Sequence, residues 1–333
     1  MLCGVRMGAI VAKALVKHFS EDIKAVDGID LDIPEGQVFG FLGQNGSGKS
    51  TTVRMLTTLL KPTSGSASVG GVDVLANPDR VRRSVGVAMQ EVGLDEIQTG
   101  RELLTLQARL FGVPTATAKQ RTGELLEVVG LTADADRSLK GYSGGMKRRL
   151  DLACALVHQP RIVFLDEPTT GLDPITRETM WRYVEDLNKN GVTFFLTTQY
   201  LEEADRLCHD IAIMDKGKIV AKGSPEELKS SIGTDAITVG LQSSEAAATA
   251  EPVLRRFEGV DSLQTDGKQV TIYLKNGAAA VAGIVLALAD ADVKVADLRL
   301  SQATLDDVFL RATGHHLAVD QKLEADAKTK GKA

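Results

Sequence analysis

The sequence predicts an α/β fold with a mainly parallel, helix-covered sheet, followed by a smaller α+β domain. Three observations support this prediction. A glycine-rich loop joins an apolar strand to a helix near residue 45, strands and helices alternate from residue 145 to 221, and a βαββαβ order follows from residue 236. With 333 residues, of which 43% are hydrophobic and 25% charged, the chain can form about two soluble domains.

The first part of the chain, up to residue 89, is predicted to consist mainly of strands. Apolar and polar residues alternate in the early segments, whereas the segment before the glycine-rich loop is apolar throughout. Glycine and proline clusters separate these segments. The predicted elements are strands at 10–19, 25–33 and 38–42, a helix at 53–60, a β-ribbon over 67–74, a brief helix at 81–84 and a buried strand at 85–89.

A helical insertion follows. Leu103, Leu106 and Leu110 repeat at intervals of three and four residues and are predicted to form one apolar helix face. The insertion is expected to span about residues 99–141, with helices at 99–111 and 117–129.

The α/β pattern resumes near Gly145. Asp173 is a suitable N-cap, and Pro174 a suitable first residue, for the second helix of this region. The first domain is therefore expected to span residues 8–230. The predicted elements are helices at 145–158 and 174–190, strands at 161–165 and 193–197, and a hairpin of 211–214 with 218–221.

A ferredoxin-like domain is predicted over residues 236–313, because strands and helices follow the order βαββαβ there. The tail at 314–333 is rich in Lys, Asp and Ala and is predicted to be disordered. The predicted elements are strands at 236–241, 260–264, 269–274 and 293–300, and helices at 244–257, 278–289 and 304–313.

The glycine-rich loop matches the pattern G-x-x-x-x-G-K-[ST] and is predicted to bind a nucleoside triphosphate. Its glycines let backbone N–H groups approach a polyphosphate, and the following helix N-terminus favours negative charge. Lys49 is expected to reach the terminal phosphates, and the Ser50 hydroxyl to bind Mg²⁺. The alternative is an ordinary turn, against which the flanking strand and helix argue. The predicted contacts are Gly43, Gln44, Asn45, Gly46, Ser47, Gly48, Lys49, Ser50 and Thr51.

Two carboxylates follow the apolar strand at 161–165. Asp166 ends a buried strand on the sheet that carries the loop, where a Mg²⁺ site needs a ligand. Glu167 is placed to polarise an attacking water. The alternative, an acidic turn after a strand, is common in isolation but fits less well beside a phosphate loop. The pair therefore predicts nucleotide hydrolysis.

A second anion site is predicted where Ser143, Gly144 and Gly145 open a helix. Ser143 can cap this helix, and the two glycines expose N–H groups at its positive end. The basic run from Lys147 to Arg149 is interpreted as a solvated helix face in preference to a phosphate contact.

Composition narrows the class of protein. A net charge of −5 gives no argument for nucleic-acid binding, and no apolar stretch approaches the roughly 18 residues of a membrane span. Residues 1–8 lack a long apolar core, so a secretory signal is not expected. The three cysteines, Cys3, Cys154 and Cys208, show neither C-x-x-C spacing nor an even count. The simplest interpretation is a cytosolic chain whose cysteines are reduced.

In their order and spacing, the segments GQNGSGKST, Gln90, YSGGMKRRL, IVFLDEP and TTGLD resemble an ABC-transporter ATPase subunit over roughly residues 8–230. The resemblance implies a P-loop NTPase cassette with a parallel-sheet core, an antiparallel β-subdomain and a helical subdomain. It also implies ATP and Mg²⁺, with Gly43–Thr51 as the Walker A loop and Asp166 and Glu167 at the end of Walker B.

The resemblance assigns further roles outside the loop and the two acids. It implies that Gln90 contacts the metal and senses the membrane partner, and that Asp173 belongs to the D-loop. It implies that Ser143 and Gly145 bind the γ-phosphate held by the opposite subunit. The aromatic residue that stacks on adenine would be Phe19.

One position departs from the family pattern. Gln199 stands where the family usually has a switch histidine. A glutamine amide can donate a hydrogen bond to a γ-phosphate but cannot carry a proton. We therefore expect Glu167 to act as base, with Gln199 positioning the phosphate. TTQYLEEAD and residues 305–314 resemble the daunorubicin/doxorubicin-resistance branch of exporters.

The resemblance also implies partners. One phosphate loop and one signature per chain predict a homodimer, closed head to tail by ATP and opened by hydrolysis, because a domain is not expected to bring its own Ser143 to its own loop. A separate permease of the ABC-2 exporter type is implied, which would place the chain at the cytoplasmic face of the membrane.

Several alternatives stay open. The chain could serve an importer, or be a soluble ABC protein acting on ribosomes or DNA, although it has one cassette and no zinc-type cysteines. The C-terminal domain could be a small-molecule sensor, but an accessory domain that contacts the permease or the dimer is preferred. A drug, lipid, antibiotic or polysaccharide would all fit as cargo.

Overall fold

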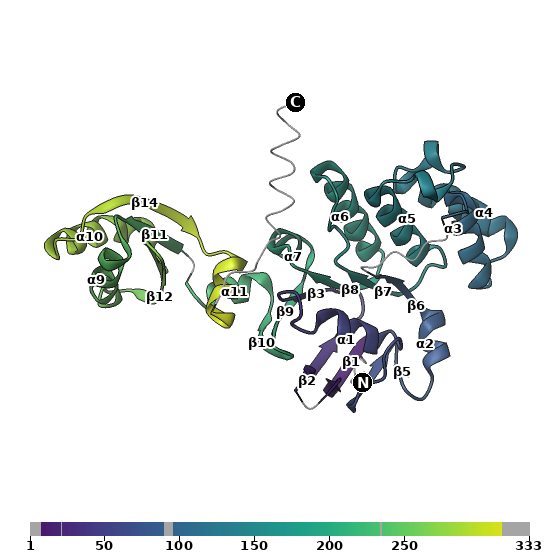
Figure 1. The fold of residues 1–333 in the computed structure, drawn as a ribbon, viewed down its shortest axis with the longest axis horizontal. Coiled ribbons are helices and arrows are strands. Elements are labelled where there is room, and N and C mark those ends of the chain that lie inside the picture. Colours follow the sequence, from purple (N-terminus) through teal and green to yellow (C-terminus); the bar gives the residue numbers. More distant parts are fainter. Residues whose placement is uncertain (1–7, 21, 90–95, 234, 315–333) are drawn as a thin grey trace, which may run out of the picture. The chain divides into compact units, whose positions relative to one another are not determined.

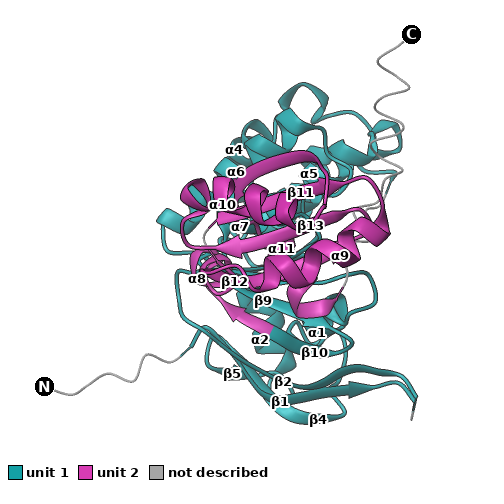
Figure 2. Ribbon diagram, turned by 90° about the vertical axis from the view of Figure 1, so that its left-hand side faces the viewer, with its two compact units in different colours: residues 1–220, 318–333 teal, residues 221–317 magenta. Residues whose placement is uncertain are grey.

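The computed structural model describes residues 8–20, 22–89, 96–233 and 235–314, and the chain divides into two compact units between Val220 and Ala221 (Figures 1 and 2). Unit 1, teal in Figure 2, contains the glycine-rich loop, and unit 2, magenta, contains the C-terminal segment. The domain limits given above stay a prediction. Among the described helices, none combines the length and apolar character that crossing a membrane requires.

Unit 1 is built on a six-stranded sheet in the order β10-β9-β3-β8-β7-β6, and the division between the units falls within the edge strand β10. β3 runs parallel to β8 and β9, and β7 runs parallel to β6 and β8. Every residue of β3, β7 and β8 is buried, which explains their apolar sequences. The strands are β3 (Val38–Leu42), β6 (Val85–Ala88), β7 (Ile162–Asp166), β8 (Thr193–Thr198), β9 (Asp210–Asp215) and β10 (Lys218–Gly223).

An antiparallel sheet in the order β2-β1-β4-β5 forms the second layer of unit 1. Apolar side chains of both sheets and of α1 share one core, in which the rings of Phe39, Phe41 and Phe164 each lie 5.5 to 5.6 Å from that of Phe195. The strands are β1 (Ile10–His18), β2 (Lys24–Ile33), β4 (Ser64–Val69) and β5 (Val72–Asp73).

Helices cover the six-stranded sheet on both faces, with α5 and α6 on one side and α1 on the other (Figure 1). α1 contacts β2, β4 and β7 and therefore lies between the two sheets. The helices are α1 (Lys49–Leu56), α2 (Pro78–Ser84), α5 (Gly144–Leu156), α6 (Pro174–Lys189) and α7 (Leu201–Leu207).

The helix predicted at 53–60 begins earlier and ends earlier than expected. α1 starts at Lys49 because the glycine-rich loop leads directly into its first turn. It ends at Leu56 because Thr58 adopts a left-handed conformation (φ +65°), and the N–H groups of Leu59 and Leu60 turn back to the Arg54 carbonyl. α7 was not predicted from the sequence.

The helical insertion consists of α3 (Gly100–Leu110) and α4 (Thr115–Val128), which pack on each other and on α5. A capping box of Thr99 and Glu102 starts α3. The predicted leucine face is wrong in part. Leu103 is buried, but Leu110 is 71% exposed, because α3 packs through Leu103, Leu104 and Ala108 instead.

Unit 2 has the predicted ferredoxin-like arrangement. Its sheet has the order β12-β13-β11-β14, with every neighbouring pair antiparallel. α9 and α10 pack on this sheet, and α8 packs on α11. The elements are β11 (Asp235–Leu241), β12 (Val260–Asp266), β13 (Gln269–Leu274), β14 (Val295–Gln302), α8 (Pro225–Ser230), α9 (Ser244–Arg255), α10 (Gly277–Asp290) and α11 (Leu305–Thr313).

Candidate active site

The glycine-rich loop connects the carboxyl end of β3 to α1 and approaches its neighbours too closely for larger residues. A Cβ atom on Gly48, whose φ is +113°, would lie 2.2 Å from the carbonyl oxygen of Ala25. A Cβ atom on Gly43 would lie 2.5 Å from the carbonyl oxygen of Met214. Glycine is therefore required at both positions, and the loop leads directly into the N-terminus of α1.

Lys49 is buried across this loop. Its ammonium donates hydrogen bonds to the carbonyl oxygens of Gly43 (2.6 Å) and Gln44 (3.0 Å). Burial lowers the pKa of Lys49, while the nearby carboxylates of Glu167 and Asp166 oppose this shift. The cation thus lies between the loop and the two acids.

Asp166 is the last residue of β7, and its carboxylate is hydrogen-bonded to the first turn of α1 and to β8. One of its carboxylate oxygens, Oδ1, accepts hydrogen bonds from the hydroxyl groups of Ser50 (3.1 Å) and Thr197 (2.5 Å). Among the described residues, no group of three or more His, Cys, Asp or Glu could hold a metal by itself. One carboxylate and one hydroxyl at a phosphate loop suit Mg²⁺, which usually shares its ligand shell with waters and substrate phosphates.

Glu167 follows in a conformation rare for a residue with a side chain, with φ +52°. Its N–H donates to the carbonyl (3.0 Å) and the hydroxyl (3.1 Å) of Thr197. The Thr170 hydroxyl lies 3.4 Å from one carboxylate oxygen. Burial raises the pKa of Glu167, with a further contribution from Asp166, and Lys49 opposes it. A carboxylate with a raised pKa suits a general base.

Gln199 lies at the same edge of the sheet. β8 pairs with β3 on one side and β7 on the other, in a register that places Thr198 opposite Leu42 and Thr197 opposite Asp166. Gln199 comes next along the chain and is 4% exposed. The fold therefore places it between the strand that leads into the loop and the strand that ends in the acids.

The signature segment begins with a serine that bonds within its own helix. The Ser143 hydroxyl accepts from the N–H of Met146 (3.2 Å) and caps α5, as predicted. Ser143 and Gly144 are exposed, so this helix end is accessible to a second molecule. Asp173 likewise caps α6, where it accepts from the N–H of Thr176 (3.0 Å).

Phe19 follows the end of β1 and is 58% exposed, with the ammonium of Lys17 5.2 Å from its ring centroid. The strand after this turn, β2, contains Ala25, which closely approaches Gly48. The exposed ring is therefore free to stack on a ligand, and its role in adenine binding stays a prediction. Gln90 lies outside the described residues.

The interpretation of the basic run as a solvated face is wrong for Arg148, which is only 7% exposed. Its guanidinium turns inward, toward the carbonyl groups that follow β7, and it is not a phosphate contact in this chain. Thr197 and Arg148 are the two site residues that sequence reasoning missed. For Thr197, the only available signal was a hydroxyl residue at the end of a predicted strand.

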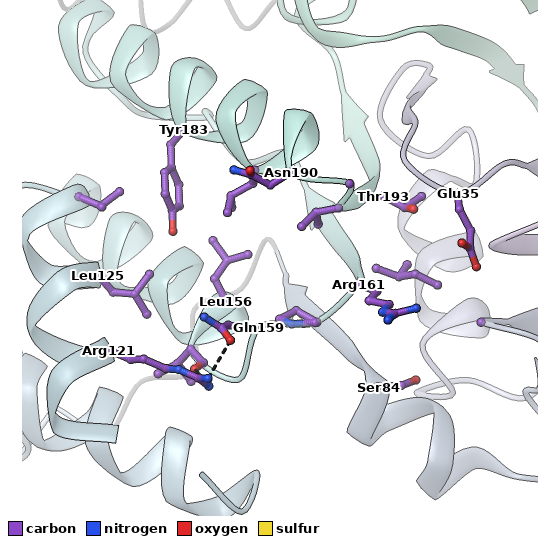
Figure 3. Close-up of a pocket in the computed structure, with 18 of the residues that line it drawn as sticks. Glu35, Ser84, Arg121, Leu125, Leu156, Gln159, Arg161, Tyr183, Asn190 and Thr193 are labelled. Carbon is purple, nitrogen blue, oxygen red and sulfur yellow. Dashed lines mark hydrogen bonds between the residues drawn. The ribbon is translucent and has the colours of Figure 1, made fainter. Parts of the chain in front are cut away.

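A cavity of about 910 Å³ lies elsewhere in unit 1 (Figure 3). Its lining includes Ser84, Ile162 and Thr193, which lie at the amino ends of β6, β7 and β8. The loop and the acids follow the carboxyl ends, where open α/β sheets bind their ligands. This cavity is therefore not the nucleotide site.

Comparisons with known proteins agree with this geometry. The family model "ABC transporter" matches residues 26–170, and "ATP-binding protein DrrA1-3-like, C-terminal domain" matches residues 223–313. The chain is 44% identical over 312 residues to the daunorubicin/doxorubicin resistance ATP-binding protein DrrA of Streptomyces peucetius, covering 92% of this chain and 93% of that protein. It is 37% identical to Nod factor export ATP-binding protein I of Cupriavidus metallidurans, covering 93% of this chain and 99% of that protein.

Two solved structures share the cassette fold. An ATP-binding subunit of an ABC transporter matches with a TM-score of 0.63 and 26% identity, covering 66% of this chain and 92% of that one. A dimeric ATP-binding cassette in a post-hydrolysis state, bound to ADP and Pi, matches with a TM-score of 0.61 and 25% identity, covering 65% of this chain and 98% of that one. The chain therefore belongs to the ATP-binding subunits of ABC transporters and is an ATPase with a DrrA-like C-terminal domain.

Proposed function

We propose that this chain hydrolyses ATP to power the export of a small molecule, such as a drug, an antibiotic or a lipid, through a separate ABC-2 permease. The observation that carries the proposal is the grouping of Lys49, Ser50, Asp166 and Glu167 at one edge of the sheet. Relatives named for drug resistance and for Nod factor export support the direction of transport. The working position would be peripheral, at the cytoplasmic face of the membrane.

In this proposal the loop backbone and the N-terminus of α1 hold the phosphates of ATP, and Lys49 neutralises the terminal ones. Phe19 stacks on the adenine. Ser50 and Asp166, with Gln90, would hold Mg²⁺, and the ion would supply positive charge to neutralise the phosphates.

Hydrolysis is then carried by the residues around the γ-phosphate. Glu167 accepts a proton from the attacking water, and its raised pKa makes it a better base than an exposed carboxylate. Gln199 donates a hydrogen bond from its amide to the γ-phosphate. Because a glutamine side chain does not titrate, Gln199 itself adds nothing to the pH dependence of turnover.

The site is completed by a second copy of the chain. Ser143, Gly144 and Gly145 at the exposed start of α5 contact the γ-phosphate held by the partner, with Asp173 beside them. Removing one preorganised donor to developing charge costs about 2.7 to 4 kcal/mol, so a monomer lacking these donors would be a poor ATPase. ATP thus closes the dimer and hydrolysis opens it.

The variant Glu167→Gln tests this proposal. We expect ATP and Mg²⁺ to convert it into a stable dimer that retains ATP, with turnover lowered about 10² to 10⁴-fold, the usual contribution of a general base. Phosphate release gives the turnover, and size exclusion with light scattering gives the mass. Glu202→Gln, at an exposed position, is the matched control and keeps wild-type turnover. Normal hydrolysis by Glu167→Gln would exclude Glu167 as the base.

A dilution series tests the dimer separately. The specific activity of the wild-type chain should fall as its concentration is lowered, because the monomer lacks half of each site. A constant specific activity from a protein that stays monomeric would exclude the composite site.

A further inference from the structure

Arg148 makes an unusual set of contacts. It lies in the second turn of α5, and its guanidinium donates hydrogen bonds to four backbone carbonyl groups. Three of these groups are consecutive along the chain, beginning at the last residue of β7, and the fourth belongs to the residue that follows β6. The acceptors are the carbonyl oxygens of Asp166, Glu167 (2.9 Å), Pro168 (3.3 Å) and Met89.

Its neighbours in the basic run point elsewhere. The Arg149 guanidinium donates to the carbonyl oxygens of Val129 (2.8 Å) and Gly130 (3.3 Å), after α4, and Lys147 pairs with Glu96. Arg148 therefore differs from them in direction, since it connects the signature helix to the segment that carries both acids.

Burial of this charge is costly. Desolvation lowers the pKa of Arg148, and the carboxylate of Asp151, 3.6 Å away, contributes most to the opposite shift. A buried ion pair adds little stability, because its attraction is largely offset by the loss of hydration. A planar guanidinium with donors in a rigid fork, however, can hold several acceptors in one geometry.

The segment that Arg148 holds is itself strained. Glu167 has a left-handed φ of +52°, a conformation that persists only when the surroundings over-determine it. Thr197 holds the N–H of Glu167, and Arg148 holds its carbonyl oxygen. The direction of the Glu167 side chain depends on this peptide conformation.

We propose that Arg148 is a positioning residue for ATP hydrolysis, which fixes the backbone of residues 166–168 so that Glu167 reaches the attacking water. The same guanidinium also holds the carbonyl group of Met89, which follows β6. This inference rests on the proposed role of Glu167 as the base.

Two substitutions of Arg148, to lysine and to glutamine, distinguish the shape of its guanidinium from its positive charge. Lysine keeps the positive charge, but one ammonium cannot span carbonyl groups from two segments. We therefore expect Arg148→Lys to lower kcat about 10- to 100-fold, since a misplacement of about 1 Å can cost up to a hundredfold, and to leave the dissociation constant for ATP within about twofold. Phosphate release and competition with a fluorescent ATP analogue measure the two quantities.

Glutamine at this position removes both the fork and the charge. We therefore expect Arg148→Gln to lower kcat at least as much as Arg148→Lys, again with the dissociation constant for ATP within about twofold of wild type.

Leu152→Ala provides the structural control, because Leu152 is buried on the same helix. It should lower the melting temperature without changing kcat. The inference is overturned if Arg148→Lys keeps kcat within twofold of wild type. It is also overturned if Leu152→Ala loses as much kcat as Arg148→Lys when both variants have lost the same amount of melting temperature. If Arg148→Gln does not fold, these two variants decide the question.

Glu167→Gln, run in parallel, separates this inference from the function on which it rests. Normal hydrolysis by Glu167→Gln would refute the role of Glu167 itself. An inactive Glu167→Gln together with a fully active Arg148→Lys would refute only the role of Arg148.

Discussion

A single hydroxyl group organises both acids of the candidate active site. The Thr197 hydroxyl donates to Asp166 and accepts from the N–H of Glu167, so the two neighbouring residues are held from one point on β8. At the amino-acid level the site is thus a network, in which Asp166 and Glu167 depend on residues from other strands and helices. A buried network of this kind is rigid because each member is satisfied by another.

Gln199 leads to a prediction at the level of the single residue. Gln199→Ala should lower kcat about 10² to 10³-fold with little change in ATP affinity, because the lost donor acts on charge that develops in the transition state. Steady-state phosphate release and nucleotide competition measure both. Gln120→Ala, an exposed amide on α4, is the control and should match wild type. A loss of ATP affinity with kcat unchanged would instead indicate that Gln199 acts only in ground-state binding.

At the level of secondary-structure elements, the single helix α5 contributes to the site in two places. Its N-terminus presents Ser143 and Gly144, and its second turn presents Arg148 to the segment after β7. Asp151 lies one turn beyond Arg148 and is mostly buried. The amphipathic pattern of the helix is therefore interrupted by polar residues that serve contacts within unit 1.

Asp151 gives this helix a testable pH dependence. Burial raises its pKa from 3.8 to about 6, and Arg148 opposes the shift. Since the folded state holds the proton more tightly, this group stabilises the fold fully below pH 3.8, and the contribution is lost as the pH rises through 6. Relative to wild type, Asp151→Asn should therefore gain about 2 kcal/mol of unfolding free energy between pH 4.5 and 7. Urea unfolding at several pH values measures the difference, and a constant difference would contradict the raised pKa.

At the level of the whole molecule, the two units have separate cores. The core of unit 2 is formed by residues of β11, β13, α9 and α10, among them Ile237, Leu254, Ile272 and Ile284. The nucleotide site belongs to unit 1. The two units should therefore respond independently to a ligand and to a core mutation.

Calorimetry tests this independence. Ile272→Ala should leave a cavity in the core of unit 2 and lower its free energy of unfolding by about 2–5 kcal/mol. The unfolding transition of unit 1 should not change. A non-hydrolysable ATP analogue at about 100 times its dissociation constant should stabilise unit 1 alone, by about 2.7 kcal/mol. A single transition that moves with both changes would show that the units unfold together.

The sequence by itself determined the motifs whose residues are neighbours in the chain. The apolar runs, the loop from Gly43 to Thr51, the caps Ser143 and Asp173, and the pair Asp166 and Glu167 are local patterns, and periodicity and turn chemistry are enough to find them. The βαββαβ order of unit 2 could be read for the same reason. Element ends were less predictable, as the early end of α1 shows, because the return of two N–H groups to Arg54 is a matter of backbone conformation.

Only the tertiary structure decided which distant residues meet. β8 follows β7 in the chain but lies between β7 and β3 in the sheet, and this order brings Thr197 to Asp166 and Gln199 to the loop edge. Arg148 looked like a surface residue because its acceptors are backbone carbonyl groups, which no side-chain pattern reveals. Strand order and backbone acceptors depend on long-range packing, and a local sequence pattern carries no information about either.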